Sequence, residues 1–556
     1  MSTTPDRSTS PPELSARTRE SNLRRMNLES FDVAVIGGGI TGAGAALDAA
    51  TRGLKVALVE KSDFASGTSS RSSKLIHGGL RYLEQMEFGL VYESLHERAV
   101  MSRIAPHLSK PLQFLIPVYS SAARSPLGTN RFKLSAGLWL YDLLAGRRNV
   151  GRHRWLSREA ALALAPALES RGLRGAFCYY DCLTDDSRLV IEVIKSAAAH
   201  GAVIANYVGA FGLRRNYDGL TAIKLKNLLG GDELELRACV TINATGVWAD
   251  EISRLSRTNA LPRLRPSKGI HVVIPSAKLK NSTAVLIPSL GENRFLFVIP
   301  WHGFTVIGTT DSDYSGDPDD PRAESAEIDR VIKSAAVAFP EARLSVSDVI
   351  STFAGLRPLI AGGEKSTKEL SRREAIFEED LGLVTITGGK LTTWRRMAEQ
   401  VIDIAVRKLQ AAGALSHRPE CVTEMVKLAG GAVTGDPGKD ASIASSDFGV
   451  ELSTAQHLID TYAGNYRVIL QLTRESHELK RRLVEGLPYI SAEVFYAARH
   501  EMAVTVEDIL SRRTRIELLS PDQGQACEER VRDLLQLEVG KRDAVSRESD
   551  RELTPK

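Results

Sequence analysis

Long apolar runs are missing from this chain. No stretch approaches the roughly 18 apolar residues that a membrane-spanning helix requires, so the sequence predicts no such helix. Cysteine is scarce as well. Its five copies lack Cys-x-x-Cys spacing, which suggests no metal site, and their odd number favours reduced thiols over disulfides. A large excess of charge is also absent, because the formal net charge is only +4. Nothing global therefore points to nucleic acid as a partner.

What is present is an ordinary globular composition. The 556 residues are 43% hydrophobic and 25% charged, and the chain is long enough for two or three domains. The first 28 residues differ, since they are rich in Ser, Thr, Pro and Arg and have no apolar core. A secretory signal needs that core, and the acids Asp6, Glu13 and Glu20 argue against a mitochondrial transit peptide. Residues 1–28 are therefore predicted to be a disordered tail.

The most informative feature is a glycine turn near the N-terminus. The apolar residues 32–36 predict a buried strand, and Gly37, Gly39 and Gly42 follow on the G-x-G-x-x-G spacing of a dinucleotide site. The helix after them would direct its free amides at a pyrophosphate. Glu60 ends the next strand, where it can accept hydrogen bonds from ribose hydroxyls. This acid argues against NADP but does not choose between NAD and FAD.

Later patterns predict two more layers. Residues 203–213 and 233–243 favour strands that return to the first sheet, and short alternating runs between 269 and 308 favour an antiparallel second sheet. From about 453 to 537, apolar residues recur at helical spacing. Glycines and prolines between 430 and 438 indicate a linker before this helical domain.

Six segments together resemble the family of FAD-dependent glycerol-3-phosphate dehydrogenases. The most specific is Ser-Ser-Lys-Leu-Ile-His-Gly-Gly-Leu-Arg-Tyr-Leu-Glu at 72–84. The others are Val-Ile-Gly-Gly-Gly at 35–39, Asn-Ala-Thr-Gly at 243–246, Ile-Gly-Thr-Thr-Asp at 307–311, Gly-Leu-Arg-Pro at 355–358 and Gly-Gly-Lys-Leu-Thr-Thr at 388–393. The resemblance covers roughly residues 30 to 535.

The resemblance implies an α/β plus α fold. A Rossmann-like FAD-binding domain of the glutathione-reductase/D-amino-acid-oxidase type carries an antiparallel-sheet substrate domain and a helical C-terminal domain. The implied reaction converts sn-glycerol 3-phosphate to dihydroxyacetone phosphate, with FAD as cofactor and a membrane quinone as electron acceptor. Eukaryotic members carry C-terminal calcium-binding loops, which this sequence lacks, so it resembles the bacterial type. A cytoplasmic protein, peripheral on the inner face of the cytoplasmic membrane, is expected.

The resemblance and the patterns together give a domain division. After the tail at 1–28, the FAD-binding domain is expected at 29–110, 181–265 and 348–410, the substrate domain at 111–180 and 266–347, a linker at 411–452, the helical domain at 453–540 and a frayed tail at 541–556. The sequence leaves open whether the helical domain is a dimer interface, a lid support or a stabiliser. A homodimer is therefore one possible assembly.

The resemblance also places twelve residues at FAD. Gly37, Gly39 and Gly42 are expected at the pyrophosphate, Glu60 at the adenosine ribose, and the backbone of Val208 at adenine. Ser69, Ser70 and Ser73 are expected near the flavin. Thr245, Gly246, Gly389 and Leu391 are expected to approach the cofactor from later segments.

The substrate chemistry requires cations and a base. A phosphate dianion should draw cations from separate segments. Arg81 and Arg357 suit it because a guanidinium can hold two oxygens, while Lys390 could neutralise phosphate or bias the flavin. Loss of the hydroxyl proton needs a base with a near-neutral pKa. His77 is the first candidate and His271, at the start of a strand, the second.

Two further segments have more than one interpretation. The turn at 309–311 either shapes a hairpin or contacts substrate. The apolar segment 131–144, followed by four arginines between 147 and 154, is either a core helix with a solvated basic loop or an element lying in a membrane interface.

Three other functions remain open at this stage. A glycerol-3-phosphate oxidase would share the substrate but pass electrons to oxygen, giving hydrogen peroxide. An amino-acid or hydroxy-acid oxidase of the same fold is disfavoured by the cations. A catalytically silent flavin-binding scaffold would need the glycine turn but not His77, Arg81, Arg357 and Lys390 together.

Overall fold

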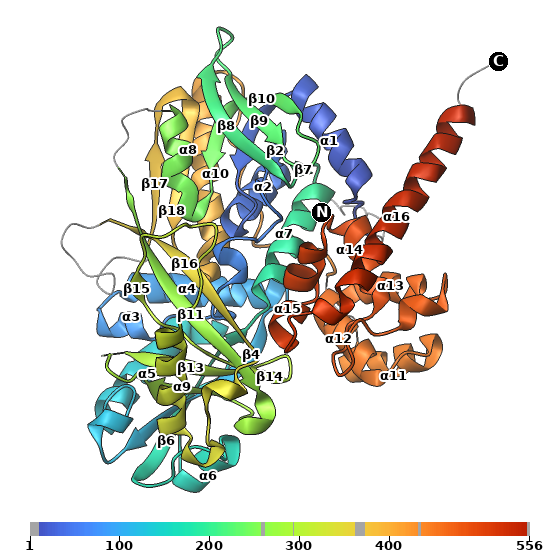
Figure 1. The fold of residues 1–556 in the computed structure, drawn as a ribbon. Helices are drawn as coiled ribbons and strands as arrows, with labels where there is room; N and C mark the ends of the chain where they lie inside the picture. The colour runs from blue at the N-terminus through green and yellow to red at the C-terminus, as the bar shows by residue number, and fades with distance from the viewer. Residues whose placement is uncertain (1–10, 257–261, 293, 362–372, 432–434, 553–556) are drawn as a thin grey trace.

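The computed structural model describes residues 11–256, 262–292, 294–361, 373–431 and 435–552, except for the side chains of residues 81, 84 and 539–552. Two sheets occupy the upper and lower parts of the molecule in Figure 1, and a group of helices lies beside them.

The first sheet is built around β1 (Ser30–Ile36), which pairs in parallel with β2 (Val56–Val59) and β10 (Glu233–Asn243). Helix α2 (Ile40–Thr51) follows β1 and packs against α7 (Asp186–Ala199) and α10 (Trp394–Ala411). Every residue of β2 is buried, as expected for a strand covered on both faces. The remaining elements of this layer are β7 (Val203–Ala205), β8 (Val208–Arg215), β9 (Thr221–Asn227), β17 (Glu374–Glu378), β18 (Leu383–Gly388) and α8 (Ala249–Ser256).

The second sheet is mostly antiparallel, with one parallel pair between β4 and β12. Its strands are β3 (Leu75–Ile76), β4 (Lys110–Tyr119), β5 (Arg154–Leu156), β6 (Leu173–Leu183), β11 (Leu264–Pro275), β12 (Ala284–Pro288), β13 (Phe295–Trp301), β14 (Phe304–Gly308), β15 (Ser312–Asp313) and β16 (Ser351–Ile360). The helices of this part are α3 (Arg81–Glu84), α4 (Phe88–Ile104), α5 (Arg131–Ala145), α6 (Arg158–Leu164) and α9 (Ser325–Ala338).

Strand β16 corrects one predicted domain boundary. The expected FAD-binding segment 348–410 begins with this strand, yet β16 pairs with β11 of the second sheet from Ser351 to Ile360. The strand then leads into the segment that holds β17 and β18 of the first sheet. The boundary was placed too early because a buried strand of either sheet has the same apolar pattern.

The helical domain begins earlier than predicted. It comprises α11 (Pro437–Phe448), α12 (Leu452–Tyr462), α13 (Tyr466–Leu472), α14 (Ser491–His500), α15 (Ile516–Leu519) and α16 (Gln525–Glu552). Helix α11 lies inside the predicted linker 411–452, but Ala441 and Ala444 on it are buried in the same core as α12 and α14. The predicted frayed segment 541–556 continues α16 as far as Glu552. Residues 553–556 lie outside the described part.

The predicted disordered tail is wrong for residues 16–28. They form helix α1 (Ala16–Leu28), which is capped by Ser15. Leu14 joins the helical domain through backbone bonds to Arg499 and Met502. Arg19 is 6% exposed and donates hydrogen bonds to the Asn206 carbonyl oxygen and to Asn227 Oδ1, at 2.9 and 2.7 Å. The polar composition concealed this helix because only two of its residues, Arg19 and Met26, are buried. Residues 1–10 lie outside the described part.

Among the described residues, no helix is both long enough and apolar enough to cross a membrane.

Replacing Arg19 tests the docking of α1. We expect Arg19→Met to destabilise the protein by about 1–3 kcal/mol, because buried acceptors lose their donors. Arg24→Met on the same helix is the matched control: its pair with Glu20 is exposed, and its loss should cost less than about 1 kcal/mol. Urea unfolding of both variants measures the difference, and equal midpoints would contradict a docked α1.

Candidate active site

A cavity lies where three strands of the first sheet end. β1, β10 and β18 are parallel neighbours, so their carboxyl ends meet at one edge. Each strand runs into a turn of small residues. Ten of the twelve residues expected at the cofactor line this cavity: Gly37, Gly39, Glu60, Ser69, Ser73, Val208, Thr245, Gly246, Gly389 and Leu391.

The turn after β1 leaves no room for side chains. Gly37 has a φ of +111°, and a Cβ there would lie 2.6 Å from the carbonyl oxygen of Ala244. A Cβ on Gly42 would lie 1.9 Å from the carbonyl oxygen of Gly37. Gly42 therefore seats α2 beneath the turn and does not line the cavity. The amides at the start of α2 lack helical acceptors and suit an anionic group.

Glu60 links the glycine turn to the second strand. Its carboxylate accepts hydrogen bonds from Gly38 N at 2.6 Å and from Ser62 N at 2.8 Å. Burial raises the pKa of Glu60, and the two backbone bonds oppose that rise. Each carboxylate oxygen can accept more than one bond, so the group can also receive a ribose hydroxyl. These features fit a dinucleotide cofactor.

The serine-rich loop behaves differently at its three predicted positions. Ser69 Oγ accepts a bond from Ile40 N at 3.0 Å, and Ser73 Oγ lies 2.9 Å from His271 Nε2. Ser70 does not line the cavity, contrary to expectation: it is buried, and its Oγ donates to Gly67 O. Residues 68–70 form a short 3-10 helix, which turns neighbouring hydroxyls in different directions.

Four of the five predicted catalytic residues line the same cavity. His77 follows β3, His271 lies on β11, Arg357 on β16, and Lys390 in the turn after β18. Fold topology thus brings together residues far apart in the sequence. The side chain of Arg81 lies outside the described residues.

Arg357 is held by the turn at 309–311. Its Nη1 lies 3.3 Å from Asp311 Oδ1, and its Nη2 donates to Thr309 Oγ1 at 3.0 Å. Thr310 Oγ1 in turn accepts a bond from Ile270 N, which fixes the turn to β11. The turn is therefore more than a hairpin, because it orients a cationic side chain of the cavity wall.

Lys390 and His77 are fixed by neighbours from α3, α4 and the turn after β18. Lys390 Nζ lies 3.8 Å from the centre of the Tyr82 ring and 3.2 Å from Ser94 Oγ. His77 N donates to Thr392 Oγ1 at 3.0 Å. Both side chains therefore sit on a wall formed jointly by the two sheets.

His271 is the most enclosed of these residues. It is 2% exposed, and its ring stacks on Phe353 with the centres 4.7 Å apart. Burial lowers the pKa of His271 well below its usual range, and the positive charges of Lys74 and Arg357 lower it further. The imidazole is therefore neutral at physiological pH.

A second chamber of about 1340 Å³ shares a wall with the cavity. Ser73, Leu75, His77, Tyr82 and Arg357 line both spaces. The chamber continues between the second sheet and α5. The apolar part of its wall includes Phe114, Ile116, Leu134, Leu138, Leu286 and Phe297, and charged residues such as Glu87, Lys133, Glu292 and Arg294 line other parts. It is larger than a typical small-molecule pocket of about 300–1000 Å³.

Sequence reasoning missed Lys74. Its ammonium is fully buried and donates to Ser70 O at 2.6 Å and to Asp186 Oδ1 at 2.8 Å. Burial lowers the pKa of Lys74 to about 8, with Asp186 acting against this shift. Its place inside the motif at 72–84 was the available signal. Its burial depends on a carboxylate 112 positions away.

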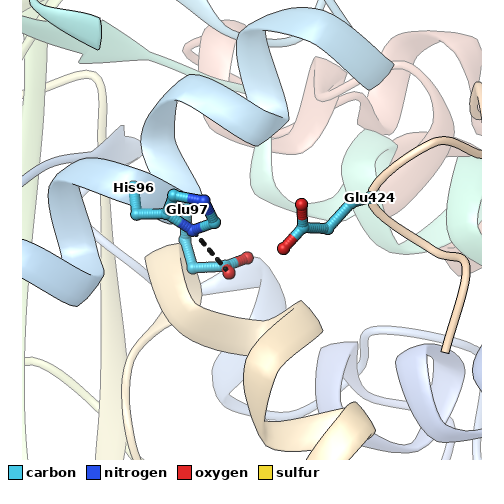
Figure 2. A group of neighbouring side chains, drawn as sticks. All are labelled: His96, Glu97 and Glu424. Atoms are coloured by element: carbon cyan, nitrogen blue, oxygen red, sulfur yellow. Dashed lines mark ion pairs between the residues drawn. The ribbon is translucent and has the colours of Figure 1, made fainter.

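Among the described residues, one group has the side chains to hold a metal: His96, Glu97 and Glu424 (Figure 2). Arg395 already contacts its carboxylates, donating to Glu97 through Nε and Nη2 at 2.9 and 2.7 Å and approaching Glu424 within 3.3 Å. The guanidinium supplies the positive charge that a cation would bring. We therefore assign this group as an ion-pair cluster.

Known families match nearly the whole chain. Residues 32–395 match the model described as FAD dependent oxidoreductase, and residues 421–545 match the C-terminal domain of alpha-glycerophosphate oxidase. Glycerol-3-phosphate dehydrogenase 2 of Mycobacterium bovis is 41% identical over 515 residues, which cover 92% of this chain and 85% of the relative. Aerobic glycerol-3-phosphate dehydrogenase of Staphylococcus aureus is 37% identical over 511 residues, covering 90% and 89%.

Solved structures agree with this result. The glycerol-3-phosphate dehydrogenase from Bacillus halodurans, complexed with FAD, superposes with a TM-score of 0.74 at 29% identity, covering 94% of this chain and 97% of that one. L-alpha-glycerophosphate oxidase from Mycoplasma pneumoniae shares the fold at 20% identity, with a TM-score of 0.53 over 69% and 95% of the two chains. Because the family model and these relatives match most of its length, and its cavity has the glycine turn of a dinucleotide site, the chain belongs to the family of FAD-dependent glycerol-3-phosphate dehydrogenases.

Proposed function

We propose that this protein oxidises sn-glycerol 3-phosphate to dihydroxyacetone phosphate and delivers the electrons to a membrane quinone. The observation that carries the substrate assignment is the meeting of Arg357 and Lys390 with two histidines on one cavity wall. Relatives named for this substrate support it. FAD, when bound, supplies the hydride acceptor. The division into an FAD-binding and a substrate domain is retained, with β16 moved to the latter.

The cations would bind the substrate phosphate. Arg357 presents a planar guanidinium that Asp311 and Thr309 hold in one orientation, which lowers the entropy lost on binding. Lys390 is held over Tyr82 on the same wall, and Arg81 is proposed to join them from the start of α3. A site built for a phosphate dianion disfavours amino-acid substrates. The glycine oxidase structure from Geobacillus kaustophilus, at 21% identity, shares only the fold.

His77 is proposed to accept the hydroxyl proton. It lines both the cavity and the larger chamber, so a substrate entering from the chamber would meet it. His271 is proposed to act as a neutral hydrogen-bond partner that fixes Ser73 beside the flavin. The presence of cations and a base on one wall favours an enzyme over a silent flavin-binding scaffold.

The apolar part of the chamber wall supports a quinone as acceptor. Its aromatic and aliphatic side chains suit a hydrophobic ring better than they suit oxygen, which needs no pocket of this size. A glycerol-3-phosphate oxidase remains the second candidate because the Mycoplasma pneumoniae oxidase shares the fold. Peroxide production separates the two.

Helix α5 is the proposed contact with the membrane. Leu138, Tyr141 and Ala145 are buried on one face, whereas Phe132, Trp139 and Leu143 on the other face are 88%, 63% and 75% exposed. The exposed stripe is flanked by the cations Arg131, Lys133, Arg147 and Arg148. Apolar side chains with cationic flanks suit an anionic lipid surface. The protein would then be cytoplasmic and peripheral on the inner face of the cytoplasmic membrane.

Anaerobic mixing tests the reaction. We expect sn-glycerol 3-phosphate to bleach the flavin band near about 450 nm. Glycerol is the matched control, because it has no phosphate to bind Arg357 and Lys390, and it should bleach far more slowly. A quinone analogue should restore the band. Restoration by oxygen with release of peroxide would instead establish the oxidase, and a band that does not bleach would refute the substrate.

The pH dependence tests the base. A base acts when deprotonated, so kcat/KM falls as pH drops through its pKa. We expect His77→Asn to lower kcat/KM by about 10²–10⁴-fold and to abolish this acid limb. His271→Asn should keep the limb, because burial and the nearby cations already hold the pKa of His271 well below its usual range. The reverse pattern would assign the base to His271.

Vesicle sedimentation tests α5. We expect Trp139→Ser/Leu143→Ser to release the protein from vesicles of phosphatidylcholine and phosphatidylglycerol while reduction of a soluble dye continues. Leu229→Ser, which alters an exposed leucine on the β9–β10 hairpin, is the matched control and should stay bound. Unchanged binding of the double variant would contradict the assignment, and loss of dye reduction would indicate unfolding.

A further inference from the structure

Three buried arginines project from one short segment of the helical domain. Arg512, Arg513 and Arg515 lie at the end of η12 (Asp508–Arg513) and just before α15, and each is at most 4% exposed. The segment η12 contacts α7 in the layer of the first sheet, and α15 contacts β16 of the second sheet. In Figure 1 these elements lie where the helical domain joins the rest of the molecule. We call these residues the arginine clasp.

The first two arginines hold the loop after β2. Arg512 Nε donates to Asp63 Oδ2 at 2.5 Å, and Arg513 donates to both carboxylate oxygens at 2.7 and 3.0 Å. Asp63 is fully buried and lies three residues after Glu60, on the loop that continues from the cavity wall. The helical domain therefore neutralises a carboxylate of the loop expected at the adenosine ribose.

The third arginine holds the loop expected at the flavin. Arg515 contacts Asp185 with Nε and Nη2, and its Nη2 also donates to Asp186 Oδ1 at 2.6 Å. Asp186 is fully buried, and its Oδ2 accepts bonds from Ser72 N at 3.0 Å and Ser72 Oγ at 2.7 Å. Asp186 therefore connects the arginine clasp to the serine loop (residues 66–74).

Further hydrogen bonds hold the serine loop in place, both within the loop and to its neighbours. Lys74 donates to Asp186 and to Ser70 O, which closes the loop on itself. Ser69 contacts the first amide of α2, and Ser73 contacts His271. Moving Asp186 would therefore displace groups that line the cavity.

The link between the helical domain and the serine loop depends on buried charges. A buried carboxylate that loses its cation carries a large desolvation cost, so the structure around it rearranges. A guanidinium can contact two carboxylates through separate N–H groups, as Arg515 does, whereas an ammonium is a point charge without that fork.

We propose that the helical domain positions the FAD-binding loops through the arginine clasp, with Arg515 as the positioning residue of the serine loop. The inference rests on the assignment of the cavity to FAD and is independent of the substrate. It gives the C-terminal domain a role in cofactor retention.

Cofactor affinity tests the proposal. FAD would be titrated into the deflavinated full-length chain, with quenching of flavin fluorescence as readout and thermal unfolding measured in parallel. We expect Arg515→Met to raise the Kd for FAD by about 10–100-fold, as loss of a charge-assisted bond implies, and to shift the visible flavin spectrum. Arg515→Lys should recover part of the affinity, because the charge remains but the fork is lost.

Arg499 provides the matched control. It forms the same two-bond fork to Glu538, at 2.7 and 2.8 Å, inside the helical domain. Arg499→Met should lower the melting temperature while leaving the Kd for FAD within about threefold of wild type. Wild-type affinity in Arg515→Met would overturn the proposal. An equal loss of affinity in Arg499→Met would also overturn it, since general destabilisation of the domain would then be the cause.

A double-mutant cycle keeps the test valid if Arg515→Met does not fold. Arg515→Lys and Ser72→Ala alter the two sides of Asp186, so their effects on the Kd for FAD should be non-additive if both act through that carboxylate. Additive effects would refute the connection.

Discussion

The contact between two backbone turns is the constraint on which the rest of this structure depends. The turns after β1 and β10 approach so closely that a Cβ on Gly37 would lie 2.6 Å from Ala244 O. β1 and β10 are parallel neighbours, so the turns that follow them meet at the same edge of the sheet. This contact fixes the start of α2, whose Gly42 packs beneath the turn. The second sheet and the helical domain are then arranged around this edge.

Around that edge, buried and half-buried cations are matched by carboxylates from other parts of the chain. Arg357 meets Asp311, Lys74 meets Asp186, and Arg513 meets Asp63. Pairing removes most of the cost of burying charge and also fixes side-chain direction. These pairs hold the side chains of the proposed substrate wall in defined orientations. Under the proposed function, the catalytic geometry would depend on the ion pairs behind the wall as much as on the residues that line it.

Local pattern was enough to predict part of this arrangement. The glycine spacing and the acid at Glu60 located one side of the cavity, because each depends on the neighbouring strand alone. The family resemblance, and not local pattern, placed Thr245 and Gly389 there. Ser70 was misplaced because a 3-10 turn decides which hydroxyl faces inward. Helix α1, the fold of residues 437–448 and the arginine clasp escaped prediction because partners distant in sequence bury them, and a single sequence does not reveal such pairs.

The clasp has a consequence for the order in which this protein is made. A nascent chain that has reached the end of α10 at Ala411 contains every strand of the first sheet, but Asp63 and Asp185 still lack their arginines. About 100 more residues must leave the ribosome before the clasp exists, which takes about 5–20 s. The loops of the flavin site therefore acquire these contacts only near the end of synthesis. Strand β1, which begins the site, is among the first segments to be made.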